Sequence, residues 1–261
     1  HWQKKYNYDL IDREAKILNE LYQSYIIPVF SVDVFTYKGV KIPYQIMPFI
    51  EEPNIFDYVK LKRLSLEHKI KLIIKLSEAL YDAHHSLMDT SIIHSDLKPE
   101  NILIRRGSPL LIDWGIAKLL RLESLDDIEQ RKQYAEECST QWTAPELKAS
   151  GQLTRHSDIY SLGLILLAIV TENKEQLDVP ECLTEEHIPD DMVALPAQSD
   201  NVSSDFTFTQ QIKRNKYNAN LADLGEIIKK ATAQDPHDRF ANMAEFRDEL
   251  TRFIELKRVN C

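Results

Sequence analysis

Apolar positions along the chain follow two patterns, one typical of strands and one typical of helices. Residues 26–35 and 40–50 are rich in β-branched and aromatic side chains and flank the pair Lys38-Gly39. A glycine-containing pair between two such runs predicts two strands joined by a turn. Across residues 65–85, apolar side chains recur every three or four positions, which predicts an amphipathic helix.

The rest of the chain extends both patterns. Three short runs predict further strands, at residues 92–93, 102–104 and 110–112. Four other segments predict helices, at residues 9–21, 157–170, 221–233 and 242–253, with Ser157 and Asp158 capping the second. A few strands followed mostly by helices predict an α+β protein. Residues 171–220 are rich in Asp, Glu, Ser, Asn and Pro and predict a long, partly disordered insertion.

The composition fits a folded chain whose core needs no disulfides. The chain has 261 residues, of which 43% are apolar and 28% charged, and only 6 are glycines. This balance excludes disordered and collagen-like classes, and a chain of this length buries enough surface to be stable without cross-links. The cysteines Cys138, Cys182 and Cys261 are odd in number and lack metal-ligand spacing, which indicates reduced thiols and a cytoplasmic location.

Charge and apolar run length argue against two classes of partner. The chain carries 32 basic and 41 acidic residues, a formal net charge of −9. Nucleic-acid binding needs clustered Lys and Arg, so we expect no nucleic-acid partner. The longest apolar run, residues 159–170, is too short to span a bilayer, so we expect no membrane partner.

One segment concentrates chemically useful side chains. Asp96 is followed by Lys98 two positions on and by Asn101 three positions further, and a second carboxylate, Asp113, follows a short apolar run. Phosphoryl transfer from ATP needs such a set. One carboxylate orients the acceptor hydroxyl, a cation meets the γ-phosphate, and oxygen ligands hold Mg²⁺ against the phosphates.

These residues carry a resemblance to a known family. The octet His-Ser-Asp-Leu-Lys-Pro-Glu-Asn at residues 94–101 resembles the catalytic loop of eukaryotic-type Ser/Thr protein kinases, and Asp113-Trp114-Gly115 resembles their metal-binding triplet. Further motifs of the same family follow in the family's order: the C-helix at residues 13–18, Ala-Pro-Glu at residues 144–146, the start of the central helix at residues 157–163, and a late arginine motif at residues 235–240.

The resemblance implies a bilobal protein-kinase-like fold of the α+β class, with a truncated N-lobe. Residues 1–50 would form the reduced N-lobe, consisting of the C-helix and the strands that end in the hinge. Residues 51–261 would form the helical C-lobe, with an insertion at about residues 171–220.

The resemblance also implies roles for individual residues. Asp96 would be the catalytic base and Lys98 the γ-phosphate ligand, while Asn101 and Asp113 would hold Mg²⁺. Leu103 would form the floor under the adenine. The remaining nucleotide-binding residues would be Met47 as gatekeeper, Pro48, Phe49 and Ile50 as hinge, and Glu14 on the C-helix paired with Lys4 or Lys5. The apolar members of this set would equally suit a plain strand core.

The resemblance leads to three further expectations. The family's late arginine, here Arg239, pairs with the glutamate of Ala-Pro-Glu, here Glu146, so we expect a largely buried ion pair. Residues 141–143 resemble those of the tyrosine-kinase-like group of Ser/Thr kinases, which places Ser139 near the acceptor-binding threonine position. His94 is expected to be a packed structural histidine under the metal-binding triplet.

The sequence departs from the family pattern at three places. No glycine-rich loop precedes the C-helix, because the first glycine is Gly39. The strand lysine that pairs with Glu14 has no clear counterpart, since Lys4 and Lys5 lie unusually close to it. Ser95 replaces the arginine that usually precedes the catalytic aspartate, which marks a non-RD kinase. Trp114 in place of phenylalanine is a mild change that the casein kinase two family shares.

Three functions follow from these features. The first is a Ser/Thr protein kinase that uses ATP and Mg²⁺ and phosphorylates a protein hydroxyl, which Lys98 favours. The second is a pseudokinase or kinase-like scaffold, suggested by the missing glycine loop. The third and weakest is a small-molecule phosphotransferase, a class that lacks the Lys98, Ala-Pro-Glu and Arg239 features.

Overall fold

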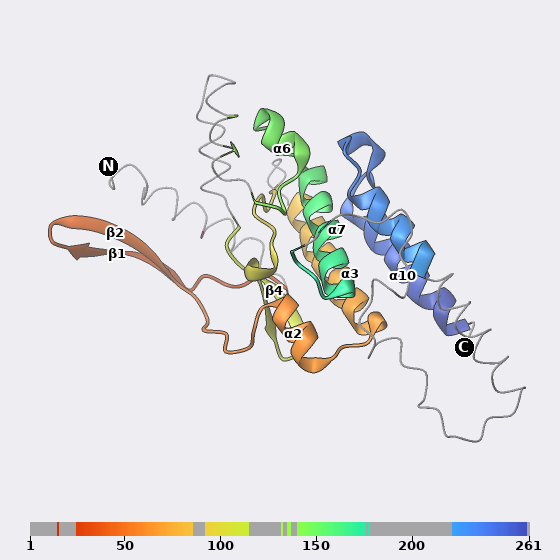
Figure 1. Cartoon of the computed structure of the whole chain (residues 1–261). Coiled ribbons are helices and arrows are strands. Elements are labelled where there is room, and N and C mark those ends of the chain that lie inside the picture. Colours follow the sequence, from red (N-terminus) through yellow and green to blue (C-terminus); the bar gives the residue numbers. More distant parts are fainter. Residues whose placement is uncertain are drawn as a thin grey trace, which may run out of the picture.

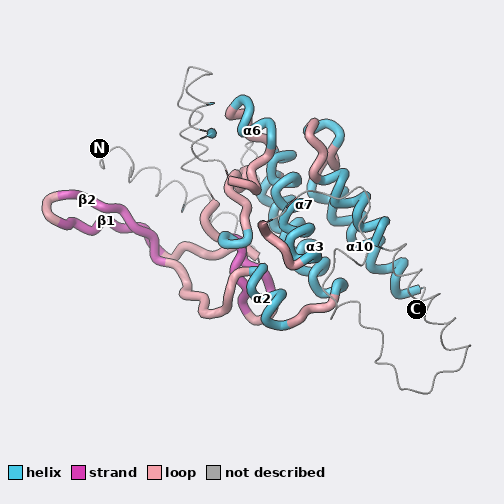
Figure 2. The backbone as a smooth tube through the Cα atoms, viewed as in Figure 1, coloured by secondary structure: helices cyan, strands magenta, loops and turns pink. Residues whose placement is uncertain are grey.

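The computed structural model describes the two hairpins and the helical body of the chain. The described residues are 15, 25–85, 92–114, 132, 135–136, 140–175, 177 and 221–259. Figure 1 shows a long hairpin that extends away from a body of packed helices, and Figure 2 separates the strands and helices by colour. None of the described helices is long and apolar enough to cross a membrane.

The long hairpin consists of β1 (Ser31–Tyr37) and β2 (Val40–Ile46), paired antiparallel from the Ser31–Ile46 rung to the Tyr37–Val40 rung. The predicted turn is confirmed, since Lys38 and Gly39 both have positive φ, 48° and 78°. This conformation matches the turn type that suits the twist of a two-residue hairpin. The predicted strand bounds are wrong at their outer ends, because residues 26–30 and 47–50 are not in the hairpin.

Residues 26 and 27 pair with a second hairpin instead. This hairpin consists of β3 (Ile102–Arg105) and β4 (Ser108–Leu111). The N–H of Ile27 donates to the carbonyl of Leu111 at 3.0 Å, and Ile26 forms a parallel bridge with the same residue. The predicted strand at residues 92–93 is wrong. The N–H of Ile92 donates at 3.1 Å to the carbonyl of Ala83, near the end of the preceding helix, rather than to a strand.

The helices make up most of the body. Their bounds are Ile55–Lys62 (α2), Leu66–His84 (α3), Pro145–Ser150 (α6), Arg155–Thr171 (α7) and Met243–Val259 (α10), and residues 221–231 are also helical. Two short 3-10 turns accompany them, Pro99–Asn101 (η2) and Pro236–Asp238 (η4). The sequence patterns did not predict α2 and α6, because each is too short to show a clear helical period.

The helix α7 forms the centre of the body. All its residues from 157 to 170 are buried except Tyr160, which is partly buried. A helix that is apolar on all sides is typical of a protein interior. Its cap differs from the prediction: Thr154 is the N-cap, and the Ser157 hydroxyl accepts a hydrogen bond from the Thr154 N–H at 3.2 Å. Asp158 lies one residue further on, and its carboxylate accepts hydrogen bonds from another segment of the chain, described below.

Close packing fixes α7 against its neighbours. It contacts α3, and α3 in turn contacts α10. A Cβ atom added at Gly163 would lie only 2.8 Å from the Cβ of Ala231 and 2.9 Å from the Cγ2 of Thr232. The helix α7 and the helix at residues 221–231 can therefore approach this closely only because residue 163 has no side chain. The predicted helix at 9–21 and most of the predicted insertion at 171–220 lie outside the described residues, although Ala15 is helical and buried.

Candidate active site

The octet at residues 94–101 lies in a turn between α3 and β3. Residues 92–98 are irregular, and η2 then begins with Pro99, which suits the first position of a helical turn. The N–H of Asn101 donates to the carbonyl of Lys98 at 3.0 Å. This tight turn carries Asn101 back toward Asp96, five positions earlier in the chain.

Two side chains converge on one carboxylate oxygen. The Lys98 ammonium lies 2.7 Å from Asp96 Oδ2, and the Asn101 Nδ2 donates to the same oxygen at 3.0 Å. The Asn101 Nδ2 also donates to the backbone carbonyl of Asp96 at 2.9 Å. The three predicted residues are therefore brought together, with Asp96 and Lys98 only partly buried and Asn101 buried.

These contacts leave a suitable oxygen for a cation. Because Nδ2 of Asn101 is the donor toward Asp96, its amide oxygen is the atom that can ligate a metal. The N–H of Ile112 donates to the backbone carbonyl of Asn101 at 3.0 Å, so Asp113 directly follows a residue held to Asn101. Asp113 has a positive φ of 53° and is exposed.

The donor set suits Mg²⁺ only in part. Asn101 and Asp113 offer the hard oxygen ligands that Mg²⁺ prefers. Among the described residues, no group of three or more His, Cys, Asp or Glu side chains could hold a metal. A cation at this turn would therefore need further oxygens from a bound phosphate or from water, which is how Mg²⁺ is usually held beside nucleotides.

Asp158, on α7, holds the turn at residues 94–101 in place, a role that the sequence patterns missed. Asp158 is 1% exposed, and its carboxylate accepts hydrogen bonds from the backbone N–H groups of His94 (2.9 Å) and Ser95 (3.1 Å). The buried ring of His84 lies 2.8 Å from the same carboxylate. Asp158 therefore joins the turn at residues 94–101 to α7 and α3, and Ser95 has a φ of 65° in this arrangement. The expected helix cap was the wrong role for Asp158.

His94 is packed rather than positioned for chemistry. Its ring is fully buried and lies 4.8 Å, centroid to centroid, from the ring of Trp114, at an angle of 34° between the rings. Burial lowers the pKa of His94 despite the nearby carboxylates of Asp158, Asp96 and Asp113. The imidazole is therefore neutral near neutral pH, and the expected packing under the Asp113-Trp114 segment is confirmed.

The expected ion pair between Glu146 and Arg239 is formed. The guanidinium donates to both Glu146 oxygens, at 2.9 and 2.8 Å, and Arg239 also donates to the carbonyls of His156 and Ala233. Its guanidinium lies 4.8 Å from the ring centroid of Tyr160. Burial alone would raise the pKa of Glu146, but hydrogen bonds from Arg239 and Ser157 outweigh it and hold that pKa below its usual value.

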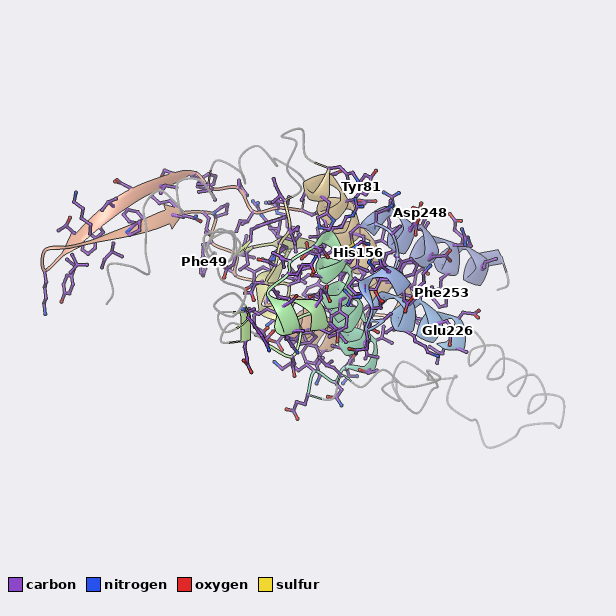
Figure 3. The ribbon with its side chains drawn as sticks, turned by 90° about the horizontal axis from the view of Figure 1, so that it is seen from above. Phe49, Tyr81, His156, Glu226, Asp248 and Phe253 are labelled. Carbon is purple, nitrogen blue, oxygen red and sulfur yellow. The ribbon has the colours of Figure 1, made fainter. Side chains whose placement is uncertain are left out.

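The predicted hinge at residues 47–50 precedes a segment that pairs with β3. Met47 and Phe49 are 39% and 87% exposed, and residues 47–50 are not in a strand, so they do not form a strand core. Figure 3 labels Phe49 at the junction of the long hairpin and the body. Shortly after it, Asn54 forms an antiparallel bridge with Leu103 on β3, and Ile104 donates to the carbonyl of Pro53 at 3.2 Å.

The remaining predicted site residues lie outside the described residues. They are Lys4, Lys5, Glu14 and Ser139. Pro48, Ile50 and Leu103 are described and partly buried.

Comparison with known families gives a match over most of the chain. The protein kinase domain family matches residues 1–250. The Ser/Thr-protein kinase PknB of Mycobacterium tuberculosis is 26% identical over 243 residues, which cover 92% of this chain and 35% of PknB. The Ser/Thr-protein kinase PknD of Chlamydia trachomatis is 25% identical over 272 residues, which cover 93% of this chain and 26% of PknD. The chain thus spans only a minor part of the length of these relatives.

Solved structures show the same fold. The crystal structure of the Mycobacterium tuberculosis PknI kinase domain matches with a TM-score of 0.57 and 19% identity. The match covers 92% of this chain and 77% of that chain. The predicted α+β, bilobal kinase-like fold is therefore confirmed.

Proposed function

We propose, on the premise that this chain belongs to the protein kinase family, that it transfers the γ-phosphate of ATP to a serine or threonine hydroxyl of a protein. Members of this family generally use ATP and a divalent metal. The observation that carries the proposal is the convergence of Lys98 and Asn101 on Asp96, with Asp113 held close by through the Ile112–Asn101 hydrogen bond.

In this proposal, Asp96 orients the acceptor hydroxyl and accepts its proton. A carboxylate suits this task because it accepts hydrogen bonds only, and two donors on Oδ2 restrict its orientation. The Lys98 ammonium, 27% exposed and two residues away, is placed to meet the transferred phosphoryl group. Asn101 and Asp113 would hold Mg²⁺, which neutralises charge on the phosphates when it is bound.

The adenine side of the site would be the segment at residues 47–50, with Leu103 as the floor. The support for this is the Asn54–Leu103 bridge, which brings the chain that follows the hinge onto β3. Glu14 would pair with Lys4 or Lys5, because the family pattern pairs this glutamate with a strand lysine. We also propose that residues 1–50 form the reduced N-lobe and residues 51–261 the C-lobe, with an insertion at about residues 171–220.

We further propose a non-RD kinase, with no phosphate-dependent contact at residue 95. Ser95 carries no charge to pair with a phosphorylated activation segment. Its N–H is already held by Asp158 at 3.1 Å, which fixes the turn without such a phosphate. Absence of nucleic-acid and membrane partners and a cytoplasmic location stay predictions.

Phosphate transfer in an Asp96→Asn variant tests the proposed function. The amide is nearly the same size but cannot accept the hydroxyl proton, so we expect transfer of labelled γ-phosphate to a protein acceptor to fall by about 10²–10⁴-fold. Asp248→Asn is the matched control, because Asp248 lies on α10 (Figure 3), is exposed, and forms an ion pair with the adjacent Arg247 at 2.8 Å. Wild-type transfer by Asp96→Asn, or no transfer by the wild-type chain with ATP and Mg²⁺, would contradict the proposal.

A further inference from the structure

Two segments beside the proposed catalytic base are held by neighbouring side chains of α7. Asp158 accepts hydrogen bonds from backbone N–H groups at the start of the turn at residues 94–101, and the Ser161 hydroxyl donates to the backbone carbonyl of Trp142 at 2.8 Å. Side chains three positions apart on a helix are neighbours. The turn and the segment at residues 140–143, which precedes Ala-Pro-Glu, therefore lie next to each other.

Lys174, just beyond the end of α7, contacts both segments at a second point. Its ammonium lies 3.8 Å from the Glu100 carboxylate in the turn, and its backbone carbonyl accepts a hydrogen bond from the Gln141 Nε2 at 2.8 Å. The same ammonium lies 5.4 Å from the ring centroid of Phe56 on α2, a helix that contacts both η2 and α7 (Figure 1). One residue thus joins α2, the turn that carries Asp96, and the segment before Ala-Pro-Glu.

An ion pair with a buried lysine fixes the chain where it leaves α7. Glu172 follows the last helical residue with a φ of 52°, a left-handed conformation that residues other than glycine rarely adopt. Its carboxylate lies 2.8 Å from the ammonium of Lys69, whose side chain is 0% exposed, and its backbone carbonyl accepts a hydrogen bond from Lys60 at 3.5 Å. Separating Glu172 from Lys69 is costly, because the buried ammonium would lose this carboxylate. The pair therefore fixes the position of Lys174, two residues later.

We propose that Lys174 is a positioning residue for the protein acceptor, because it sets the spacing between the turn that carries Asp96 and the segment at residues 140–143. This inference rests on the proposed function. An acceptor whose hydroxyl reaches Asp96 lies against both segments, so a change in their spacing weakens its productive binding. The contacts of Lys174 described above involve none of the residues proposed to bind ATP or Mg²⁺, so nucleotide binding does not depend on it.

The primary experiment measures the kinetics of labelled phosphate transfer from ATP to myelin basic protein. Lys174→Met keeps an unbranched side chain but removes its charge. We expect the KM for myelin basic protein to rise about three- to fivefold, the most that an exposed ion pair supplies, while the KM for ATP stays unchanged. Loss of a positive charge by itself would favour this basic acceptor and lower its KM, so a rise reports the spacing and not the net charge.

A matched control is available on another helix. Lys229 also lies 3.8 Å from a carboxylate, that of Glu226, and both side chains are exposed. Lys229→Met therefore removes a similar ion pair from the helix at residues 221–231, and we expect it to change neither KM.

Two further variants test the two contacts of Lys174. Lys174→Glu should raise the KM for myelin basic protein, because it sets two carboxylates against each other, and adding Glu100→Lys should restore the KM by exchanging the charges. Gln141→Leu removes the other contact without changing the net charge and should raise the same KM. Combining Gln141→Leu with Lys174→Met should add little, because either change alone breaks the link.

The possible failures are distinguishable. An unchanged KM for myelin basic protein in Lys174→Met and Gln141→Leu, or a KM for ATP that rises by the same factor, would overturn the inference. We expect unchanged thermal melting in every variant, and a KM that rises only in variants that also melt at lower temperature would make the role structural and would overturn it too. Absence of transfer by the wild-type chain would contradict the proposed function itself, and this inference with it.

Discussion

The hairpin of β1 and β2 and the helix α7 are both rich in apolar residues, but they use them in opposite ways. In α7 every residue from 161 to 170 is buried, while one entire face of the hairpin is exposed. The difference lies in the number of neighbouring layers. The helix α7 is packed against α3 and against the 221–231 helix through Gly163, whereas the hairpin face with Phe35, Tyr37 and Ile42 has no covering layer within the described residues.

The helical body and the hairpin also differ in how much they contribute to the stability of the fold. Full burial of an apolar side chain stabilises the fold by about 1.5–3 kcal/mol, and the hairpin's partly exposed side chains gain only part of that energy. The body therefore supports the fold and holds the turn at residues 94–101 through Asp158, while one face of the hairpin stays exposed. Substitutions in the two regions should have very different effects, and the following predictions measure that difference.

The largest effect is expected at the buried ion pair of the body. Arg239→Ala would leave Glu146 in a mostly buried position without its partner, and such losses cost about 3–5 kcal/mol. Chemical denaturation of the wild type and of Arg239→Ala measures this loss as the difference in their free energies of unfolding. Arg252→Ala, which breaks an exposed pair with Glu249, is the control and should change it by less than about 1 kcal/mol. Similar losses in both variants would mean that burial of the pair is unimportant.

The second prediction compares the two regions directly. Leu76 on α3 is 0% exposed, so Leu76→Ala should lower the free energy of unfolding by about 2–5 kcal/mol through the lost contacts and the cavity. Ile42, on the exposed face of the hairpin, is 39% exposed, and Ile42→Ala should cost much less in dilute protein. Equal losses would show that the hairpin is as well packed as the body.

A smaller loss is expected from Gly163→Ala in the body. The added methyl group would collide with Ala231 and Thr232, and overpacking of this kind costs about 1–3 kcal/mol. Alanine favours helices by about 1 kcal/mol over glycine, which offsets part of that cost. Thermal unfolding should therefore show a modest decrease in Tm. An increase would mean that the two helices can separate easily.

The smallest effect is a pH dependence of stability from Glu146. Its pKa in the folded chain lies below the usual value of 4.5, so the unfolded chain binds the proton more readily. The stabilisation is fully present above pH 4.5 and is lost as the pH falls through the lowered pKa of the folded state. Unfolding followed across this acidic range should show a steeper loss for the wild type than for Arg239→Ala. Identical pH profiles would contradict the assigned cause.

The proximity of the candidate site residues was predictable from the sequence. Asp96, Lys98 and Asn101 lie within six positions of one another, and Pro99 promotes the tight turn that joins them. The positioning residue Asp158 was assigned the wrong role, because its partners at residues 84, 94 and 95 are 63 to 74 positions away. No local pattern reports a hydrogen bond across that distance.

The sequence by itself determined the local elements: the turn at Lys38-Gly39, the helix from residue 66 to 84, and the family motifs that indicate the fold. Only the tertiary structure decided which apolar runs are covered. Strand alternation specifies that two faces of a strand differ, but whether a face is buried depends on which elements pack on it. For this reason residues 26–27 pair with β4, α7 becomes the core, and the face around Phe35 stays exposed.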